Sequence, residues 1–358
     1  MLNYEDIRQV HFEPTQKCQA SCPMCDRNKN GGDVNQYLEN VDISLEQFKK
    51  IFPPEFLAQL KSFYHCGNHG DPILCPDLIP ICKYIRECNP KIYMWISTNG
   101  GARNTKWWTE LAPLLNYCQF SVDGLWDTNH LYRQGVVWDR VEENMEAFIE
   151  AGGRAEWTFL VFSYNEHQVE EARQYAKLMG VDKFIVKKSG RYIHAKDTKG
   201  KDQHPVLNRK NEKTHMLGKP KDPKYRNKAT DGVYQQIVKK FGSLEVFIEG
   251  ADIKPKCIEK NEIYVSAEGH VMPCCWLHGQ IYKWWRPMSE SDVWQLINKT
   301  GGLNNINALI VPLQDAVESM FFDAVEASWE IKGCAQGRLK TCGMKCNVGF
   351  DPFKAQWQ

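Results

Sequence analysis

The sequence predicts an α/β protein, a partial (β/α)6 TIM-like barrel followed by a small α+β domain. Up to about residue 190, short apolar runs alternate with helical patterns, and this alternation favours parallel βα units. Residues 196–228 then hold eleven Lys/Arg and four Asp/Glu, without sustained apolar periodicity. The chain beyond 240 is rich in cysteine. We therefore expect a barrel at 1–195, a basic, mobile linker at 196–239 and a cysteine-rich domain at 240–358.

Six strands are expected in the barrel, each followed by a turn or a helix. They cover residues 10–13, 62–66, 92–98, 117–122, 157–162 and 184–186. Ser44 and Gln47 fit a capping box at the start of a helix. Glycines end the helices expected from 139 and from 169. In a barrel of parallel strands, function resides in the loops after the strands, and polar motifs follow several of these strands.

Composition excludes several classes of function. The net charge of +1 gives no bulk attraction to nucleic acid or membrane. Neither a signal peptide nor a long apolar run is recognisable, so we expect a cytoplasmic protein that does not contact a membrane. Fourteen cysteines in such a protein indicate metal ligation rather than disulfides.

Three cysteines near the start of the chain carry the clearest chemical signal. Cys18, Cys22 and Cys25 have the spacing C-x3-C-x2-C and follow the first expected strand. Iron–sulfur clusters are normally held by four thiolates, so three leave one iron of a 4Fe–4S cluster open to a ligand. A structural zinc site is the alternative, but it needs a fourth ligand, and the nearest candidates are His11 and Cys66.

This spacing and position resemble the radical S-adenosylmethionine (SAM) superfamily. The resemblance implies a partial barrel in which the open iron of a 4Fe–4S cluster chelates SAM. It also implies reductive cleavage of SAM to a 5′-deoxyadenosyl radical, which abstracts hydrogen from a substrate carbon. An electron donor such as flavodoxin or ferredoxin is then required.

Three further motifs resemble the SAM-binding parts of that family. Asp71, in the stretch 67–72, stands where the family has Glu in a Gly-Gly-Glu-Pro motif that binds the SAM amino group. Ser97 and Asn99 match the ribose-contacting strand end, and Ser121 and Arg133 match residues that hold the SAM carboxylate. Each motif alone also reads as an ordinary turn; their order behind the cysteines carries the resemblance.

A second cysteine set lies after residue 250. The pattern C-x11-G-x4-C from Cys257 to Cys274 resembles the start of a SPASM or Twitch domain, and the segment ending in Cys346 resembles its second half. The resemblance implies one auxiliary 4Fe–4S cluster rather than two. We favour as its ligands Cys257, Cys274, Cys342 and Cys346. Cys275 and Cys334 remain as spare thiols and candidate hydrogen-atom donors, although either could replace Cys342 as a ligand. A zinc knuckle at the four favoured cysteines is the alternative.

The substrate stays open between two classes. One is a peptide or protein side chain, the usual target of SPASM enzymes. The other is a small molecule, such as an amino sugar, nucleoside or amino acid, that undergoes dehydrogenation or epimerisation. A non-enzymatic iron–sulfur or zinc protein is a remote alternative. The polar residues expected to face the barrel lumen are His11, Glu13, Tyr64, Trp95, Glu156 and Lys187.

Overall fold

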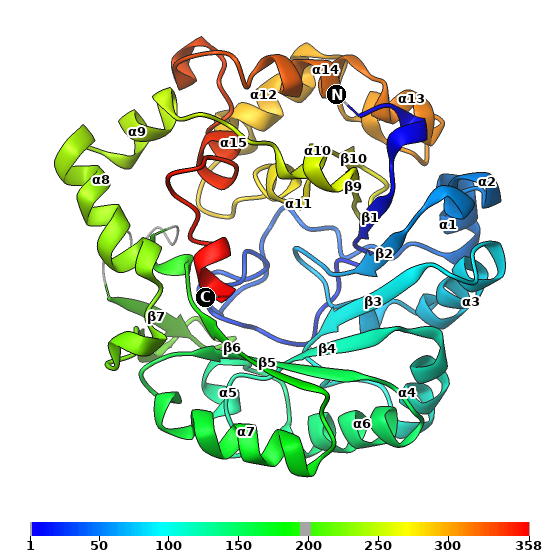
Figure 1. Ribbon diagram of the computed structural model, residues 1–358, viewed down its shortest axis with the longest axis vertical. Helices are drawn as coiled ribbons and strands as arrows, with labels where there is room; N and C mark the ends of the chain where they lie inside the picture. The colour runs from blue at the N-terminus through cyan, green and yellow to red at the C-terminus, as the bar shows by residue number, and fades with distance from the viewer. Residues whose placement is uncertain (1, 194–201, 358) are drawn as a thin grey trace.

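One eight-stranded sheet organises the molecule, and it does not close on itself. The structure is a computed structural model that describes residues 2–193 and 202–357. Within these residues the strand order is β10-β9-β1-β2-β3-β4-β5-β6, with β7 and β8 in a separate hairpin. Strands β1 to β6 are parallel to their neighbours, as the partial-barrel prediction requires. Figure 1 shows this arc of strands with α1 to α4, α6 and α7 on its outer side.

The six expected barrel strands are all present. The strands of the described residues are β1 Gln9–Phe12, β2 Ser62–His65, β3 Tyr93–Thr98, β4 Tyr117–Ser121, β5 Ala155–Val161, β6 Lys183–Lys188, β7 Gln203–Leu207, β8 Lys213–Gly218, β9 Glu262–Val265 and β10 Val271–Met272. The helices of the barrel part are α1 Leu45–Ile51, α2 Pro54–Gln59, α3 Leu78–Cys88, α4 Thr105–Leu111, α5 Asn129–Tyr132, α6 Trp138–Glu150 and α7 Val169–Leu178. Those that follow are α8 Tyr234–Phe241, α9 Leu244–Gly250, α10 Lys256–Lys260, α11 Cys275–His278, α12 Asp292–Lys299, α13 Leu313–Val317, α14 Met320–Ala327 and α15 Lys340–Lys345. The capping box at Ser44 and Gln47 forms as expected.

The lumen face of the sheet carries a row of stacked rings. His11, Tyr64 and Trp95 occupy matching positions on β1, β2 and β3. The His11 and Tyr64 ring centroids are 4.5 Å apart, and those of Tyr64 and Trp95 are 4.4 Å apart. The alternate residues, such as Val10 and Phe12, are fully buried on the helix side. The row supports the expectation that these three polar side chains point into the barrel, and it fills the lumen with aromatic surface at this level.

The C-terminal part joins the barrel sheet, which the sequence did not predict. Strand β9 pairs in parallel with β1, placing Tyr264 opposite His11, and β10 returns antiparallel to β9. The β9–β10 hairpin itself was expected from the apolar pattern around Gly269. The expected division into separate domains is crossed by this sheet and by a hydrophobic core that contains side chains from both parts. Figure 1 shows the elements after α8 completing the ring opposite β3 to β6.

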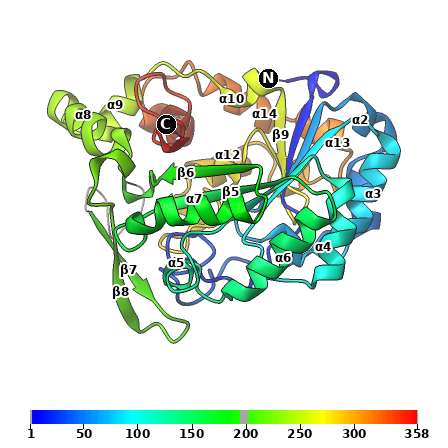
Figure 2. The same cartoon turned by 60° about the horizontal axis from the view of Figure 1, so that its bottom comes forward.

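The basic stretch contains regular structure as well as connections. The expectation of a linker without packed structure is wrong for residues 203–218, which form the β7–β8 hairpin with Val206 and Leu217 fully buried. Figure 2 shows this hairpin extending from the sheet beside α5. Part of the expected linker, residues 194–201, lies outside the described residues. Among the described helices, none combines the length and apolar character needed to cross a membrane.

Candidate functional site

The three cysteines of the first motif lie together on the loop that follows β1. Cys22 is buried, and Cys18 and Cys25 are half-buried. Burial raises the pKa of Cys22 to about 11, and the neighbouring Cys25 contributes to this rise. The pKa of Cys18 is raised by burial, by Asp71 and by the other two thiols. The fold therefore gathers three sulfur atoms in one low-dielectric site, as the spacing predicted.

Two side chains from other loops donate hydrogen bonds to these sulfurs. Asn99, after β3, places Nδ2 3.7 Å from Cys18 Sγ. Arg133, after α5, places Nη1 3.7 Å from Cys22 Sγ, and its Nε donates to Asp123 at 2.7 Å. Both residues were singled out from the sequence as SAM-binding candidates. The structure brings them to the cysteine loop, where N–H donors would stabilise thiolate charge.

The β7–β8 hairpin packs on the outer side of the cysteine loop. The Leu207 backbone N–H donates to Asn30 at 2.9 Å, and a ring nitrogen of His204 lies 3.1 Å from the Pro23 carbonyl oxygen. Arg209 donates to the Gln19 carbonyl. These contacts tie the hairpin to the cysteine loop, which the charged composition of this stretch did not indicate.

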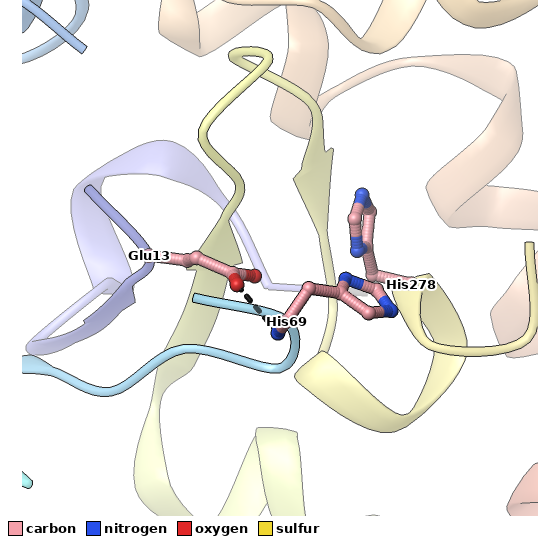
Figure 3. A group of neighbouring side chains, drawn as sticks. All are labelled: Glu13, His69 and His278. Atoms are coloured by element: carbon pink, nitrogen blue, oxygen red, sulfur yellow. Dashed lines mark hydrogen bonds between the residues drawn. The ribbon is translucent and has the colours of Figure 1, made fainter. Parts of the chain in front are cut away.

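The motif loop, residues 67–72, runs against the cysteine loop. Glu13 Oε1 accepts hydrogen bonds from the backbone amides of His69 and Gly70, at 2.7 and 2.9 Å. Figure 3 shows Glu13 beside the His69 backbone, with the His278 ring next to that of His69. A Cβ on Gly70 would lie 1.8 Å from the Thr15 carbonyl oxygen, so only glycine fits here. Glu13, which we expected only to face the lumen, therefore orients the motif loop.

Asp71 is buried and binds the end of β3. Its carboxylate accepts hydrogen bonds from Thr98 Oγ1 at 2.7 Å and from the Asn99 backbone N–H at 2.8 Å. A third bond comes from the Ile73 backbone N–H at 3.3 Å. These contacts fix the backbone of Asn99, whose side chain reaches Cys18. Asp71 thus links the motif loop to the cysteine loop through the end of β3.

The two serines singled out from the sequence make weaker contacts. Ser97 Oγ lies 3.5 Å from Gln119 Oε1, and Ser121 Oγ lies 3.3 Å from Thr158 Oγ1. Both are partly exposed at the carboxyl ends of neighbouring strands. They lie on the edge of the sheet that carries the cysteine loop.

Four cysteines of the second set come together in the C-terminal part. Burial raises the pKa of Cys274, and the charges of Cys275, Cys257 and Cys342 add to the rise. Burial likewise raises the pKa of Cys342, with Cys346 and Cys257 as further causes. The four favoured cysteines are thus electrostatic neighbours, contributed by α10, the start of α11 and α15.

The two spare thiols lie in different surroundings. Burial raises the pKa of Cys275, together with Glu262, Cys66 and Glu13, which belong to the barrel strands and their loops. Cys334 lies in a 3-10 turn, Cys334–Gln336, with Glu249 and Lys340 as its charged neighbours. Cys275 therefore lies near residues of the barrel strands and their loops, whereas Cys334 lies near α9.

Comparison with known proteins gives one family and several similar structures. Residues 12–176 match the Radical SAM superfamily. SuiB from Streptococcus suis, bound to its precursor peptide SuiA, is 14% identical, with a TM-score of 0.56 over 99% of this chain and 77% of that one. The enzyme anSMEcpe, bound to AdoMet and the Kp18Cys peptide, is 15% identical, with a TM-score of 0.54 over 97% of this chain and 95% of that one.

Another SuiB structure, bound to S-adenosylmethionine, has 60% of its chain covered by this one, at a TM-score of 0.47. A comparison with curated protein sequences gives no match. At such low identity the structural similarities establish the fold, a partial barrel with its sheet open. The matched residues begin at the end of β1, include β2 to β5 and end before β6. All three cysteines of the first motif lie within residues 12–176, the part of the chain that matches the Radical SAM superfamily.

Proposed function

We propose that the protein is an enzyme that reductively cleaves SAM at the cysteine loop and uses the resulting radical on a substrate in the barrel lumen. The observation that carries the proposal is the pair of donors aimed at the cysteine sulfurs. Asn99 and Arg133 come from separate loops, and each reaches a different thiol. A set of thiols that merely packed in the core would need no such donors.

The residues present fit a 4Fe–4S cluster with one open iron. Three thiols share one buried loop, and the N–H donors suit sulfur ligands that carry negative charge. When bound, the cluster would pass one electron from reduced flavodoxin or ferredoxin to SAM, whose C5′–S bond then breaks to give methionine and a 5′-deoxyadenosyl radical.

We assign the polar residues around the loop to the binding of SAM. Arg133 uses two of its five N–H donors on Asp123 and Cys22, which leaves donors for the SAM carboxylate. The Asp71 carboxylate can accept about four hydrogen bonds and accepts three, which leaves one acceptor position for the SAM amino group. Ser97, Asn99 and Ser121 are the further polar groups proposed to contact SAM.

We further propose one auxiliary 4Fe–4S cluster held by Cys257, Cys274, Cys342 and Cys346. Their mutual proximity supports this set over one that contains Cys334, whose surroundings hold none of the other three. Cys275 adjoins Cys274 in sequence but lies among lumen residues. This C-terminal part would then be of the SPASM or Twitch type.

For the substrate, the first candidate is a peptide or protein side chain. SuiB and anSMEcpe, which share the fold over nearly all of this chain, are both described with bound peptides. The similarity reaches the fold alone, so a small molecule remains the second candidate. The position of Cys275 favours an epimerase within either class.

In that reaction the 5′-deoxyadenosyl radical takes a hydrogen atom from the substrate. Cys275 then donates its S–H hydrogen atom to the opposite face of the substrate radical. The resulting thiyl is re-reduced by one electron and one proton from the same class of reductant. Turnover in D2O should therefore place one deuterium in the product, and Cys275→Ala should still form 5′-deoxyadenosine without that product. Deuterium-free product would instead favour dehydrogenation, with the auxiliary cluster accepting the second electron.

Anaerobic incubation with SAM and dithionite tests the proposed activity. We expect 5′-deoxyadenosine to accumulate, together with about eight irons per chain for two 4Fe–4S clusters. A protein that carries the iron but forms no 5′-deoxyadenosine would be an electron carrier and would refute the proposal. Zinc in place of iron at both cysteine sets would refute it as well.

A further inference from the structure

A group of one glutamate and two histidines, which includes none of the cysteines, lies in the C-terminal part. Glu268 and His270 flank Gly269 in the turn between β9 and β10, and His278 ends α11. One ligand atom from each of the three lies within 4.8 Å of the others. His270 is 6% exposed and His278 is fully buried. Neither the cysteine motifs nor the proposed chemistry at the cysteine loop uses these side chains.

Each of the three side chains presents an atom that has no hydrogen-bond partner in the described structure. These atoms are Glu268 Oε2, His270 Nδ1 and His278 Nε2. A buried polar atom without a partner destabilises the fold, so three such atoms in one group are unfavourable unless a ligand satisfies them. These three unpartnered atoms indicate a missing cation, because a carboxylate oxygen and two imidazole nitrogens can all coordinate a metal ion.

Surrounding residues contact the side chains of Glu268 and His278 and fix the turn that carries His270. Gln16 Nε2 donates to Glu268 Oε1 at 2.5 Å, so Oε2 is the carboxylate oxygen left without a hydrogen-bond partner of its own among the described residues. The Tyr264 hydroxyl lies 3.4 Å from His278 Nδ1, on the side of the ring opposite Nε2. Ser266 Oγ accepts from the backbone amides of Glu268 and His270, at 3.3 and 3.2 Å, and so fixes the turn. Such outer contacts are what orients the ligands of a metal site.

We propose that Glu268, His270 and His278 bind one divalent first-row metal ion, zinc, which ties the β9–β10 turn to α11. A His2Glu set is a known donor set for zinc, with one tetrahedral position left for water. His278 Nε2 and Glu268 Oε2 are 4.0 Å apart. Two ligands on a tetrahedral ion with bonds of about 2.1 Å lie about 3.4 Å apart, so a small side-chain rotation completes the pair.

A neighbouring group, Glu13, His69 and His278, also lies within ligand distance, and Figure 3 shows it. It is the poorer site because Glu13 is already occupied. Glu13 Oε1 accepts two backbone amides, and Oε2 accepts the Tyr264 hydroxyl. That hydroxyl also occupies the space beside His278 Nδ1. We therefore place the ion on the Nε2 side of His278.

The test measures zinc in the intact, cluster-bearing protein. The protein is purified anaerobically from zinc-supplemented cells, dialysed against metal-free buffer and analysed for zinc and iron by mass spectrometry. We expect about one zinc per chain in the parent. His270→Gln and Glu268→Gln should each lose at least 80% of the zinc and keep the parental iron. A chelator should lower the thermal unfolding temperature of the parent but not that of His270→Gln.

Two controls make the assignment specific. His65→Asn removes another fully buried histidine that belongs to neither group, and it should keep its zinc. His69→Gln should also keep zinc, because only the poorer site contains His69. No zinc in the parent, or zinc retained by His270→Gln, overturns the proposal. Zinc lost from Cys342→Ala but kept by His270→Gln would place the ion at the cysteines and overturn it too. Parental zinc content does not depend on SAM cleavage, so this test and that of the proposed function fail separately.

Discussion

Arg133 Nη1 lies 3.7 Å from Cys22 Sγ while the Nε of the same guanidinium donates to the buried Asp123 at 2.7 Å. Asp123 is anchored in turn, because its Oδ1 accepts from the Leu160 backbone N–H at 2.7 Å. A carboxylate fixed by β5 thus orients the arginine toward the cysteine loop. The arrangement gives Arg133 a defined direction before any ligand binds, which is the condition for recognising a carboxylate with little loss of entropy.

Arg133→Ala should weaken the binding of SAM about 10- to 100-fold. A hydrogen bond to a charged group contributes about 1.5–3 kcal/mol, and about 1.4 kcal/mol corresponds to a tenfold change in Kd. Isothermal titration of the cluster-loaded protein with SAM measures the effect. Arg140→Ala, which removes an exposed arginine that donates to the Arg103 carbonyl oxygen, is the matched control. An Arg133→Ala variant that keeps its iron and binds SAM like the parent would contradict the assigned role.

Asn99→Ala should lower the reduction potential of the cluster at the cysteine loop. The Asn99 amide donates to Cys18 Sγ, and hydrogen bonds to cluster sulfurs raise the potential by stabilising the reduced, more negative state. A redox titration followed by electron paramagnetic resonance reads the potential directly. Gln119→Ala, on the neighbouring strand, is a control in which the potential should stay the same. If Asn99→Ala leaves the reduction potential unchanged, the hydrogen bond from Asn99 to Cys18 does not affect the potential of the cluster.

The sequence predicted the local and periodic features of this fold well. The six barrel strands and the β9–β10 hairpin follow from apolar runs bounded by turn residues, and all of them form. The parallel pairing of β9 with β1 could not be predicted, because it joins residues about 250 positions apart. Nothing in a four-residue apolar strand specifies a distant partner. The β7–β8 hairpin was missed because its charged composition outweighed two buried apolar positions, Val206 and Leu217.

In the candidate site, too, the local motifs could be predicted from the sequence and the contacts between distant segments could not. Motif spacing identified the three cysteines together with Asn99 and Arg133, and the structure gathers all five. Spacing alone did not show that Asp71 binds the end of β3, or that Glu13 holds the motif loop. Glu268 and His270 carried a signal, two ligand-type residues flanking a turn glycine. Their partner His278 is recognisable only when α11 packs against that turn.

Replacing Cys342 and Cys334 separately should distinguish a cluster ligand from a spare thiol. Cys342 is buried among Cys346 and Cys257, whereas Cys334 has Glu249 and Lys340 as charged neighbours. Cys342→Ala should reduce the iron content by about four per chain, because a 4Fe–4S cluster needs all its thiolates. Cys334→Ala should keep the parental iron. If Cys334→Ala loses iron and Cys342→Ala keeps it, Cys334 is the cluster ligand and Cys342 is the spare thiol.

Lys187→Met should remove a pH dependence of stability on the alkaline side. Burial lowers the pKa of Lys187 to about 8 from its ordinary 10.5, with Arg191 and Arg133 adding to the effect. Between these two values the unfolded chain binds the extra proton, so this lysine makes stability rise with pH from about 8 to 10.5. Below pH 8 the buried lysine is charged, and burying that charge lowers the free energy of unfolding by at most about 3 kcal/mol.

Urea unfolding of parent and variant from pH 7 to 10.5 measures this effect. The difference between the two proteins isolates Lys187 from the cysteines and tyrosines that titrate in the same range. The free energy of unfolding of the parent should approach that of Lys187→Met as the pH rises. Lys183→Met, an exposed lysine on the same strand, is the control and should show no such trend. A constant difference between parent and Lys187→Met over this range would mean that Lys187 has an ordinary pKa.

The most direct test of the account compares two triple variants for the formation of 5′-deoxyadenosine from SAM under reducing, anaerobic conditions. One replaces Cys18, Cys22 and Cys25 with alanine, and the other replaces Cys75, Cys82 and Cys88, which lie in or beside α3. The account predicts that the first variant forms no 5′-deoxyadenosine while keeping about four irons at the C-terminal cysteines. The second should form it at a rate close to that of the parent. Formation of 5′-deoxyadenosine by the variant that lacks Cys18, Cys22 and Cys25 would contradict the central claim.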